Sequence, residues 1–128
     1  MRLLLDTHVL VWMTSESSRL STAAREALGD PANMPVFSVV SLWEVAIKFG
    51  LRRQDFTVDA RQVRRALLEN EFEELPVFGD HAVAVADLPP IHRDPFDRLL
   101  IAQATVEGIM LLTTDATVAR YPGPIRKV

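Results

Sequence analysis

Short apolar runs alternate along the chain with longer stretches in which apolar and polar residues recur at helical spacing. The runs of strand length lie at 2–5, 36–40, 72–75, 109–112 and 125–128. The stretches between them predict helices at 7–13, 21–28, 41–49, 59–70, 81–87 and 95–107, with a further short helix from Asp115. Because strands that alternate with helices usually pair in parallel, this pattern predicts an α/β fold with a mostly parallel central sheet of four to five strands.

The residues at the expected helix ends agree with these boundaries. Residues of the N-cap type precede five of the helices: Asp6, Ser21, Ser41, Asp59 and Asp94. Glu44 stands three residues after Ser41 and completes a capping box there. Pro95 suits the first position of its helix, where a missing N–H costs nothing, and Gly108 is a good stop for the same helix.

Composition favours a single folded domain over residues 1–128. The chain has 128 residues, 48% of them hydrophobic, which is too many for a disordered protein and enough for a core. No apolar run approaches the ~20 residues that cross a bilayer, and the first apolar run contains Asp6 and His8, unlike a signal peptide. With no cysteine there is neither a disulfide framework nor a zinc–thiolate site. We therefore expect a soluble cytoplasmic protein without a membrane partner.

Charge adds a weak indication of a polyanionic partner. The net charge is −3, which is not typical of a nucleic-acid-binding protein. Only Lys48 and Lys127 among the 14 basic residues are lysine, and arginine suits phosphate better, although a GC-rich genome explains the same bias. The arginines between positions 52 and 65 and the glutamates between 69 and 74 form separate basic and acidic stretches, a separation that can guide a polyanion along one face.

Four acids stand where the strands end or where the next helix begins. Asp6 follows the first strand directly, Glu44 follows the second by one helical turn, Asp97 lies in the first turn of the 95–107 helix, and Asp115 follows the fourth strand by two threonines. Ligands of parallel sheets bind beyond the carboxyl ends of the strands. The four carboxylates are therefore expected at one edge of the sheet.

Each acid taken singly has a structural interpretation. Asp6 and Asp115 are good N-caps, Asp97 fits a capping box, and Glu44 can complete its own capping box or pair with Lys48 four residues later. Taken together, four like charges beside apolar segments repel one another and raise one another's pKa values. A divalent cation with oxygen ligands, Mg²⁺ or Mn²⁺, removes that conflict, and such an ion can lower the pKa of a bound water and stabilise the charge that develops on a phosphate.

The motifs that carry these acids resemble those of PIN-domain ribonucleases, and among them the VapC-type toxins of type II toxin–antitoxin pairs. The matching segments are 3–8 (LLLDTH), 41–46 (SLWEVA), 94–104 (DPFDRLLIAQA) and 113–115 (TTD), in the family's order. The third segment is specific by itself, and the four in order cover essentially the whole chain. The resemblance implies a three-layer α/β/α PIN-like fold.

The resemblance also implies a function and a set of site residues. Asp6, Glu44, Asp97 and Asp115 would hold one or two Mg²⁺ or Mn²⁺ ions and catalyse endonucleolytic cleavage of RNA, in tRNA or rRNA, leaving a 5′-phosphate and a 3′-hydroxyl. Thr113 and Asp94 would support the site, Asp94 first as a helix cap. A cognate antitoxin and a homodimer are the implied partners. The apolar surface of the 7–13 helix, with Val9, Val11, Trp12 and Met13, is a candidate subunit interface.

Arginines near these motifs are candidates for binding substrate. Arg98 can pair with an acid of its own helix or contact a phosphate, and both interpretations remain open. Arg93, Arg52 and Arg53 are further candidates.

Histidines and tryptophans receive structural interpretations. His8 is expected on a helix surface, and His81 and His92 are expected to be structural or solvated, because neither has a partner at metal-ligand spacing. Trp12 and Trp43 lie in apolar helical stretches, which favours core packing, although an exposed tryptophan can stack on a base.

The sequence departs from the family pattern at two places. His8 stands where many members have Ser or Asn. Thr117 stands where many have a further acid, so that a second metal ion is less expected.

Other functions explain less of the sequence. A catalytically weak PIN fold that only binds RNA or protein does not need all four acids. A receiver-like phospho-acceptor domain needs a lysine after a late strand, and the only late lysine is Lys127 at the end of the chain. A haloacid-dehalogenase-type phosphatase needs a second aspartate where this chain has His8.

Overall fold

A computed structural model describes all residues, 1–128, and contains one five-stranded sheet. Its strands are β1 (Arg2–Leu5), β2 (Met34–Ser38), β3 (Glu73–Leu75), β4 (Met110–Thr113) and β5 (Ile125–Lys127). Their order is β3-β2-β1-β4-β5 and every pair is parallel, with Leu4 opposite Val36 on one side and Leu111 on the other. The predicted α/β fold with a parallel sheet is confirmed.

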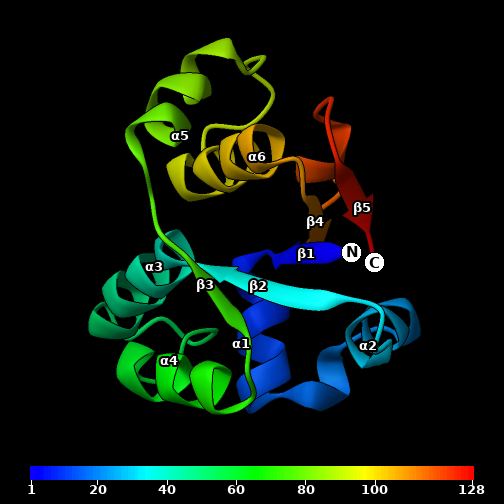
Figure 1. Cartoon of the computed structure of the whole chain (residues 1–128). Coiled ribbons are helices and arrows are strands. Elements are labelled where there is room, and N and C mark those ends of the chain that lie inside the picture. Colours follow the sequence, from blue (N-terminus) through cyan, green and yellow to red (C-terminus); the bar gives the residue numbers. More distant parts are fainter.

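Helices cover both faces of this sheet. They are α1 (Thr7–Ser15), α2 (Thr22–Gly29), α3 (Val39–Gly50), α4 (Ala60–Glu69), α5 (Gly79–Ala84) and α6 (Pro95–Glu107), with 3₁₀ turns at Ser17–Arg19, Val85–Asp87 and Val118–Arg120. Figure 1 shows α1, α2 and α4 on one side of the sheet and α5 and α6 on the other. This is the three-layer α/β/α arrangement. None of these helices is both long and apolar enough to cross a membrane.

Two apolar cores hold the layers together, one on each face of the sheet. Because side chains alternate along a strand, Leu3 and Leu5 of β1 face the core under α1, α2 and α4, whereas Leu4 faces the core under α6. All three leucines are fully buried. Each contributes about 1.5–3 kcal/mol by leaving water. Residues on both sides of β1 therefore fix its position at the centre of the sheet.

The helix that carries the most specific motif begins and ends as the sequence predicts. Asp94 Oδ1 accepts the backbone N–H groups of Phe96 (2.8 Å) and Asp97 (3.2 Å), with Pro95 at the first helical position. Gly108 ends α6 in the left-handed conformation at φ 66°, which glycine adopts without strain. The caps at Asp6, Ser21 and Asp59 are also confirmed.

The start of α3 differs from the prediction. The β-branched run 36–40 was expected to be a strand and Ser41 the cap of the next helix, but β2 ends at Ser38 and the helix starts at Val39. The hydroxyl of Ser38 accepts from Val40 N at 3.0 Å and is the actual cap. Ser41 is instead fully buried inside the helix and accepts a hydrogen bond from Thr7 Oγ1. The predicted capping box of Ser41 and Glu44 is therefore wrong.

The apolar surface of α1 is used by the protein's own core. Val9 and Val11 are buried, and Trp12 and Met13 pack against the same cluster, because α1 lies between the sheet, α3 and α4. Trp12 and Met13 stay partly exposed, so the use of this helix as a subunit interface stays a prediction.

Candidate active site

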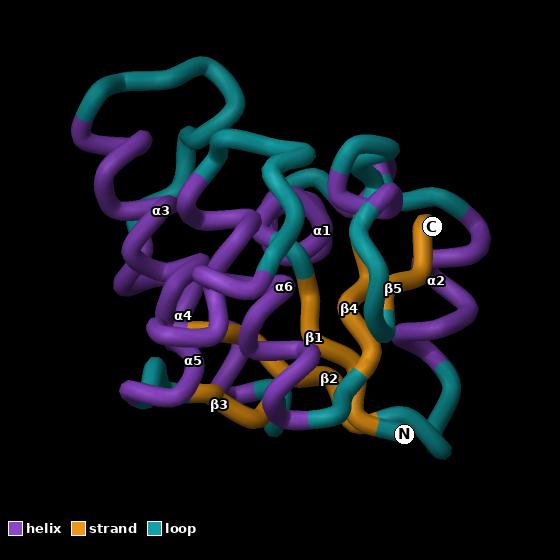
Figure 2. Tube along the Cα trace, turned by 90° about the horizontal axis from the view of Figure 1, so that it is seen from above, coloured by secondary structure: helices purple, strands orange, loops and turns teal.

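The first acid lies where the strand order reverses. The chain moves from β1 to β2 and β3 on one side and returns to β4 and β5 on the other, so β1 and β4 flank the switch point. Asp6 follows β1 and is 5% exposed; its Oδ2 accepts from Thr113 Oγ1 of β4 at 2.6 Å, and its Oδ1 accepts from His8 N. Burial nevertheless raises the pKa of Asp6 above its usual value, against these hydrogen bonds. Figure 2 shows the ends of β1 and β4 side by side with the start of α1.

Glu44 enters the same region from α3 and is left with an unsatisfied oxygen. Its side chain is 3% exposed, and Oε2 pairs with Lys48 Nζ at 2.5 Å. Oε1 has no hydrogen-bond partner, and no other buried side-chain nitrogen or oxygen of the protein lacks one. The expected pair between Glu44 and Lys48 is present, but it uses only half of the carboxylate. A buried carboxylate oxygen without a donor is costly, so this atom is suited to a cation.

Asp97 is the most strongly perturbed of the four acids. It lies in the first turn of α6, where the Asp94 cap fixes the helix end. Burial, followed by the negative charges of Asp94, Asp6, Glu44 and Asp115, raises its pKa to about 8. The negative charges of all the other acids identified from the sequence therefore raise the pKa of this one carboxylate. The expected capping box is not formed, because the N–H of Asp94 points to His92 Nδ1 instead.

Asp115 is held by the turn after β4. Its N–H donates to Thr113 Oγ1 at 3.0 Å, and its Oδ1 accepts from Thr117 N at 2.7 Å. The side chain is 42% exposed, so it forms the open side of the acidic cluster. The residues after it form a turn and a 3₁₀ segment rather than the predicted helix that starts at Asp115. Thr113 thus connects two of the acids, one through its O–H and one by accepting a backbone N–H.

His92 belongs to this cluster, and the sequence interpretation missed it. Its Nε2 lies 3.1 Å from Asp97 Oδ2 and 3.8 Å from Asp115 Oδ2. His92, Asp94 and Asp97 form a group whose ligand atoms lie within 4.8 Å of one another, close enough to share one metal ion. The available signal was the position of His92 two residues before the cap of α6. Spacing rules for a regular helix do not apply there, because the helix begins only at Pro95.

The donor atoms of the cluster fit a hard divalent cation. The four acids supply carboxylate oxygens, the ligands that Mg²⁺ and Mn²⁺ prefer. The partnerless Oε1 of Glu44 and the raised pKa of Asp97 both indicate negative charge that the protein itself does not neutralise. Among the lysines and arginines, only Lys48 pairs with one of the four acids, and its partner is Glu44.

Arg98 is used to hold a loop. Its Nη1 donates to Pro89 O (2.9 Å) and Tyr121 Oη (3.1 Å), and its Nη2 donates to Val85 O (3.2 Å). It forms no ion pair with an acid of α6, so the first of the two interpretations is wrong. With donors of both Nη atoms in use, a structural role is favoured over contact with a phosphate.

The other candidate arginines lie on the surface. Arg93, Arg52 and Arg53 are exposed. Arg53 lies 3.5 Å from Asp55, whose carboxylate also contacts His8 at 3.4 Å, and His8 follows Asp6 by two residues. Arg52 and Arg53 line a shallow hollow with Phe49 and Phe56. Their role in substrate binding stays a prediction.

The remaining histidines behave as the sequence suggests. His8 is a partly exposed residue of α1, and His81 is fully buried, 2.9 Å from Glu107. Trp43 differs from the expectation of core packing: it is 59% exposed and touches the ring of Phe96 edge-on. Phe96 precedes Asp97, so this exposed indole lies near the acids.

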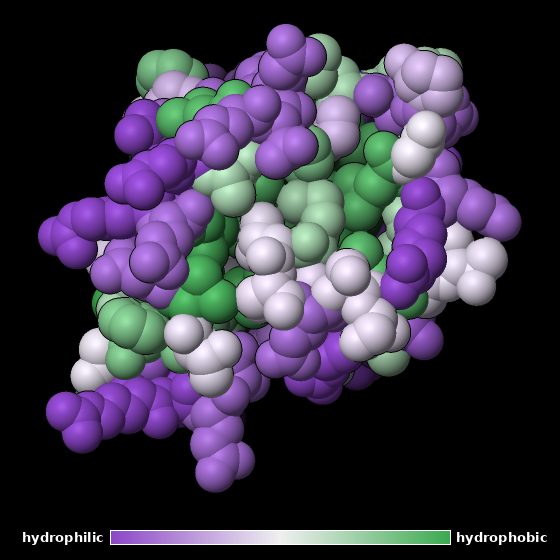
Figure 3. All heavy atoms as spheres, turned by 90° about the horizontal axis from the view of Figure 1, so that it is seen from below, coloured by the Kyte–Doolittle hydropathy of each residue, from purple (hydrophilic) through white to green (hydrophobic).

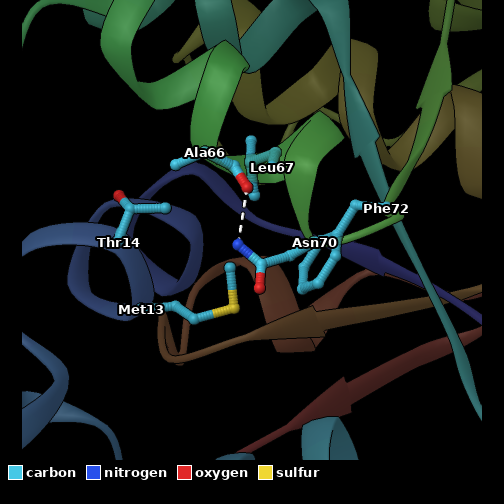
Figure 4. A pocket seen from close by; sticks show the side chains of 6 residues that line it. All are labelled: Met13, Thr14, Ala66, Leu67, Asn70 and Phe72. Carbon is cyan, nitrogen blue, oxygen red and sulfur yellow. Dashed lines mark hydrogen bonds between the residues drawn. The ribbon is translucent and has the colours of Figure 1, made fainter.

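A separate pocket lies on the face formed by α1, α2 and α4. Figure 3 shows apolar atoms between the charged side chains of this face. The pocket has a volume of about 270 Å³ and is lined by Met13, Thr14, Ala66, Leu67, Asn70 and Phe72 (Figure 4). The amide of Asn70 donates to Ala66 O, and the hydroxyl of Thr14 donates to Leu10 O. No acid of the cluster lines this pocket, and its polar groups are already used.

Comparisons with known proteins agree with this fold and acid pattern. The PIN domain family matches residues 3–124. Ribonuclease VapC22 of Mycobacterium tuberculosis (strain ATCC 25618 / H37Rv) is 31% identical over 124 residues, 95% of either chain. Among solved structures, VapBC2 from Rickettsia felis bound to a DNA fragment from their promoter has a TM-score of 0.74 at 16% identity, covering 99% of this chain and 98% of that one. VapBC-5 from Mycobacterium tuberculosis has a TM-score of 0.59 at 23% identity, covering 99% and 97%.

The match over nearly the whole length defines the class of protein. This chain belongs to the PIN-domain family, with the VapC ribonucleases as its relatives. The solved structures, all below 25% identity, agree with the fold.

Proposed function

We propose that this protein is a metal-dependent endoribonuclease, the toxin of a toxin–antitoxin pair, built as one PIN domain over residues 1–128. The observation that carries the proposal is the incomplete acidic cluster. Glu44 Oε1 is buried without a partner, and burial together with four neighbouring carboxylates raises the pKa of Asp97 to about 8. If these acids served only as helix caps, we would expect neither a buried carboxylate oxygen without a partner nor a raised pKa at Asp97.

Each site residue has a definite task in this reaction. Asp6, Glu44, Asp97 and Asp115 would hold Mg²⁺ or Mn²⁺, which supplies the Lewis acidity that activates water and stabilises negative charge on the phosphate. Thr113 holds Asp6 through its O–H, and Asp94 fixes the end of α6 so that Asp97 faces the other acids. Cleavage of the RNA phosphodiester would leave a 5′-phosphate and a 3′-hydroxyl.

The relatives support the choice of substrate and partner. The curated relative is a ribonuclease, and several of the structural neighbours are VapBC toxin–antitoxin complexes. We propose tRNA or rRNA as the substrate, in the cytoplasm, and a cognate antitoxin that covers the acids with a basic side chain, which charge complementarity favours. A homodimer is part of the same proposal.

The test is RNA cleavage with and without a chelator. Purified protein should cut RNA in Mg²⁺ or Mn²⁺, stop when EDTA is added, resume when the metal is restored, and stop again when the cognate antitoxin saturates it. Cleavage that is insensitive to EDTA, or that persists in the saturated complex, would contradict the proposal. RNA binding without cleavage in either metal would instead favour a binding module that has lost catalysis.

A further inference from the structure

Two aromatic side chains lie beside the acids and contact each other. Trp43 precedes Glu44 on α3, and Phe96 precedes Asp97 in the first turn of α6, so each ring adjoins one of the four acids in the chain. The centroids of the two rings are 5.2 Å apart and their planes meet at 71°, an edge-to-face arrangement that aromatic pairs favour. The pair therefore connects α3 with α6 where each of these helices supplies an acid.

The two rings differ in how far the protein covers them. Phe96 is partly buried, packs against the apolar core under α6, and donates its backbone N–H to the Asp94 cap. Trp43 is 59% exposed, although an indole has more apolar surface to bury than most side chains. Because Phe96 is itself held in place, its contact restrains the indole. The result is an oriented aromatic surface that is open to solvent next to the acids.

An RNA strand at the acids needs an attraction that does not depend on charge. Its phosphates are negative, and so are the four carboxylates, whose charge a divalent cation offsets only in part. Among the lysines and arginines only Lys48 pairs with one of these acids; its Nζ lies 5.7 Å from the centroid of Phe96. Every nucleobase has an aromatic face, and single-stranded RNA is commonly held by stacking of its bases on aromatic side chains. An exposed indole beside the acids supplies this kind of attraction.

We propose that Trp43 stacks on one base of an unpaired RNA segment whose neighbouring phosphodiester lies at the acids, and that Phe96 holds the indole in position. The proposal rests on the ribonuclease function proposed above, and it makes single-stranded RNA the preferred substrate, since a base inside a duplex is already stacked and paired. Val39 and Ile47 lie one turn away from Trp43 on either side and are exposed as well. A second copy of this chain on the same face of α3 is therefore the competing occupant. Aliphatic surface serves a protein partner equally well, whereas only a ring stacks on a base.

Three substitutions separate stacking from apolar contact. Trp43→Phe keeps a ring, and Trp43→Leu keeps apolar surface without one. Ile47→Ala is the matched control, because it removes apolar surface from the same face of α3 and leaves the indole in place. All are made in a parent protein that carries Asp97→Asn, so that the RNA is not cut, and Trp12→Phe, so that Trp43 is the single tryptophan. The probe is a short, labelled single-stranded RNA of mixed sequence, together with copies that each lack one base.

The measurement is the Kd from fluorescence anisotropy of the labelled RNA in Mn²⁺. We expect Kd to rise about tenfold in Trp43→Leu, within the roughly 5–150-fold that loss of one stacked base causes. It should stay within about threefold of the parent in Trp43→Phe and Ile47→Ala. One of the RNAs that lack a base should bind the parent and Trp43→Leu equally, because the partner of the ring is then already absent. Since stacking releases no counterions, Trp43→Leu should leave the dependence of Kd on salt unchanged.

Three results would overturn the proposal. They are absence of RNA binding by the parent, equal Kd values in Trp43→Leu and Ile47→Ala, and a set of RNAs in which no missing base cancels the effect of Trp43→Leu. Emission of Trp43 that shifts when the RNA-free parent is diluted would overturn it too, because a second copy of the chain would then cover the ring.

Failure of the underlying function has a different signature. If the variants bind RNA in the expected order but the protein with Asp97 intact does not cut RNA in Mg²⁺ or Mn²⁺, the ribonuclease is contradicted and the stacking is supported. If the protein with Asp97 intact cuts RNA and Trp43→Leu leaves its KM unchanged, the ribonuclease stands and the stacking is rejected.

Discussion

Two buried polar clusters lie along α6, and only one of them is complete. Around the middle of the helix, Ser38 Oγ donates to Gln103 Oε1 at 2.5 Å, and Gln103 Nε2 donates to Pro76 O at 3.2 Å. His81, fully buried, accepts from Phe78 N at one ring nitrogen and lies 2.9 Å from a carboxylate oxygen at the other. No buried side-chain atom of this group lacks a partner.

At the start of the same helix the acids around Asp97 are arranged differently. Glu44 Oε1 has no donor, and the pKa of Asp97 stands at about 8 because burial and four other carboxylates act on it. A complete buried network stabilises one conformation, whereas an incomplete one costs stability unless something binds there. The contrast teaches that burial and polarity alone do not identify a functional site. The unsatisfied group does.

Asp97→Asn should have the largest effect. Removing the carboxylate should lower RNA cleavage at least ~1000-fold, the upper range for loss of one group from a charge-stabilising site. The same substitution should stabilise the metal-free protein at high pH. Cleavage assays and thermal unfolding measure the two effects. A variant that still cuts RNA, or that unfolds at a lower temperature than wild type at pH 9, would contradict the assignment.

The sign of the stability effect follows from the direction of the pKa shift. The folded protein holds the proton of Asp97 up to about pH 8, whereas an unfolded aspartate loses it near 3.8. Between these values the folded state binds more protons, so the stability of the metal-free protein falls as pH rises from 4 to 8. Since each pKa unit corresponds to about 1.4 kcal/mol, the gain in Asp97→Asn is on the order of a few kcal/mol above pH 8 and vanishes near pH 4.

Cation affinity should depend on pH for the same reason. Below pH 8 the cation must displace the proton of Asp97, so affinity for Mn²⁺ should approach a tenfold fall per pH unit, about 50-fold in total between pH 8 and pH 6. Calorimetric titrations at a series of pH values measure this slope. In Asp97→Asn the remaining dependence should be shallower. A flat profile in the wild type would show that Asp97 is already ionised at pH 6.

Thr113→Val should have a smaller effect on cleavage. The substitution preserves shape but removes the O–H that donates to Asp6 Oδ2 and the acceptor for Asp115 N. We expect cleavage to fall about tenfold, the lower end for loss of a group that orients a metal ligand. Thr105→Val is the matched control, because Thr105 is exposed on α6 and donates only to Ile101 O within that helix. Equal rates in the two variants would remove Thr113 from the site.

Gln103→Leu should affect stability far more than chemistry. It leaves the hydroxyl of Ser38 and the carbonyl of Pro76 without their partner, so the free energy of unfolding should fall by about 2–3 kcal/mol. Urea denaturation measures this loss. The folded variant should cut RNA within about twofold of wild type, since the bonds it loses belong to the complete network. A large loss of cleavage at unchanged stability would mean that the two clusters are coupled.

Much of the fold was predictable from local patterns. The parallel sheet, the caps at Asp6 and Asp94 and the stop at Gly108 depend on residues close in the sequence, and the structure confirms them. The start of α3 was not predictable in this way. Val39 and Val40 favour a strand by themselves, whereas the Ser38 hydroxyl and tertiary packing favour a helix. Trp43 shows a related failure, since apolar spacing does not reveal which face of a helix stays uncovered.

The acids of the site were predictable one by one, and the structure places all of them around Asp97. Their assignment as ligands stays a prediction. His92 could not be found in this way, because its partners Asp97 and Asp115 come from a helix and from a turn after β4, and only the folded chain brings them together. The contacts of Arg98 were not predictable for a similar reason: its partners are carbonyl groups of a loop, which carry no sequence signature.

The incompleteness of the acidic cluster is tested most directly by Mn²⁺ titration calorimetry at pH 7, in two buffers with different ionisation enthalpies. The difference between the buffers gives the number of protons released on binding. If the pKa of Asp97 is about 8, binding should release close to one proton per protein, and Asp97→Asn should abolish that release. Absence of Mn²⁺ binding, or binding without proton release in the wild type, would contradict the claim that these carboxylates are held ready for a cation.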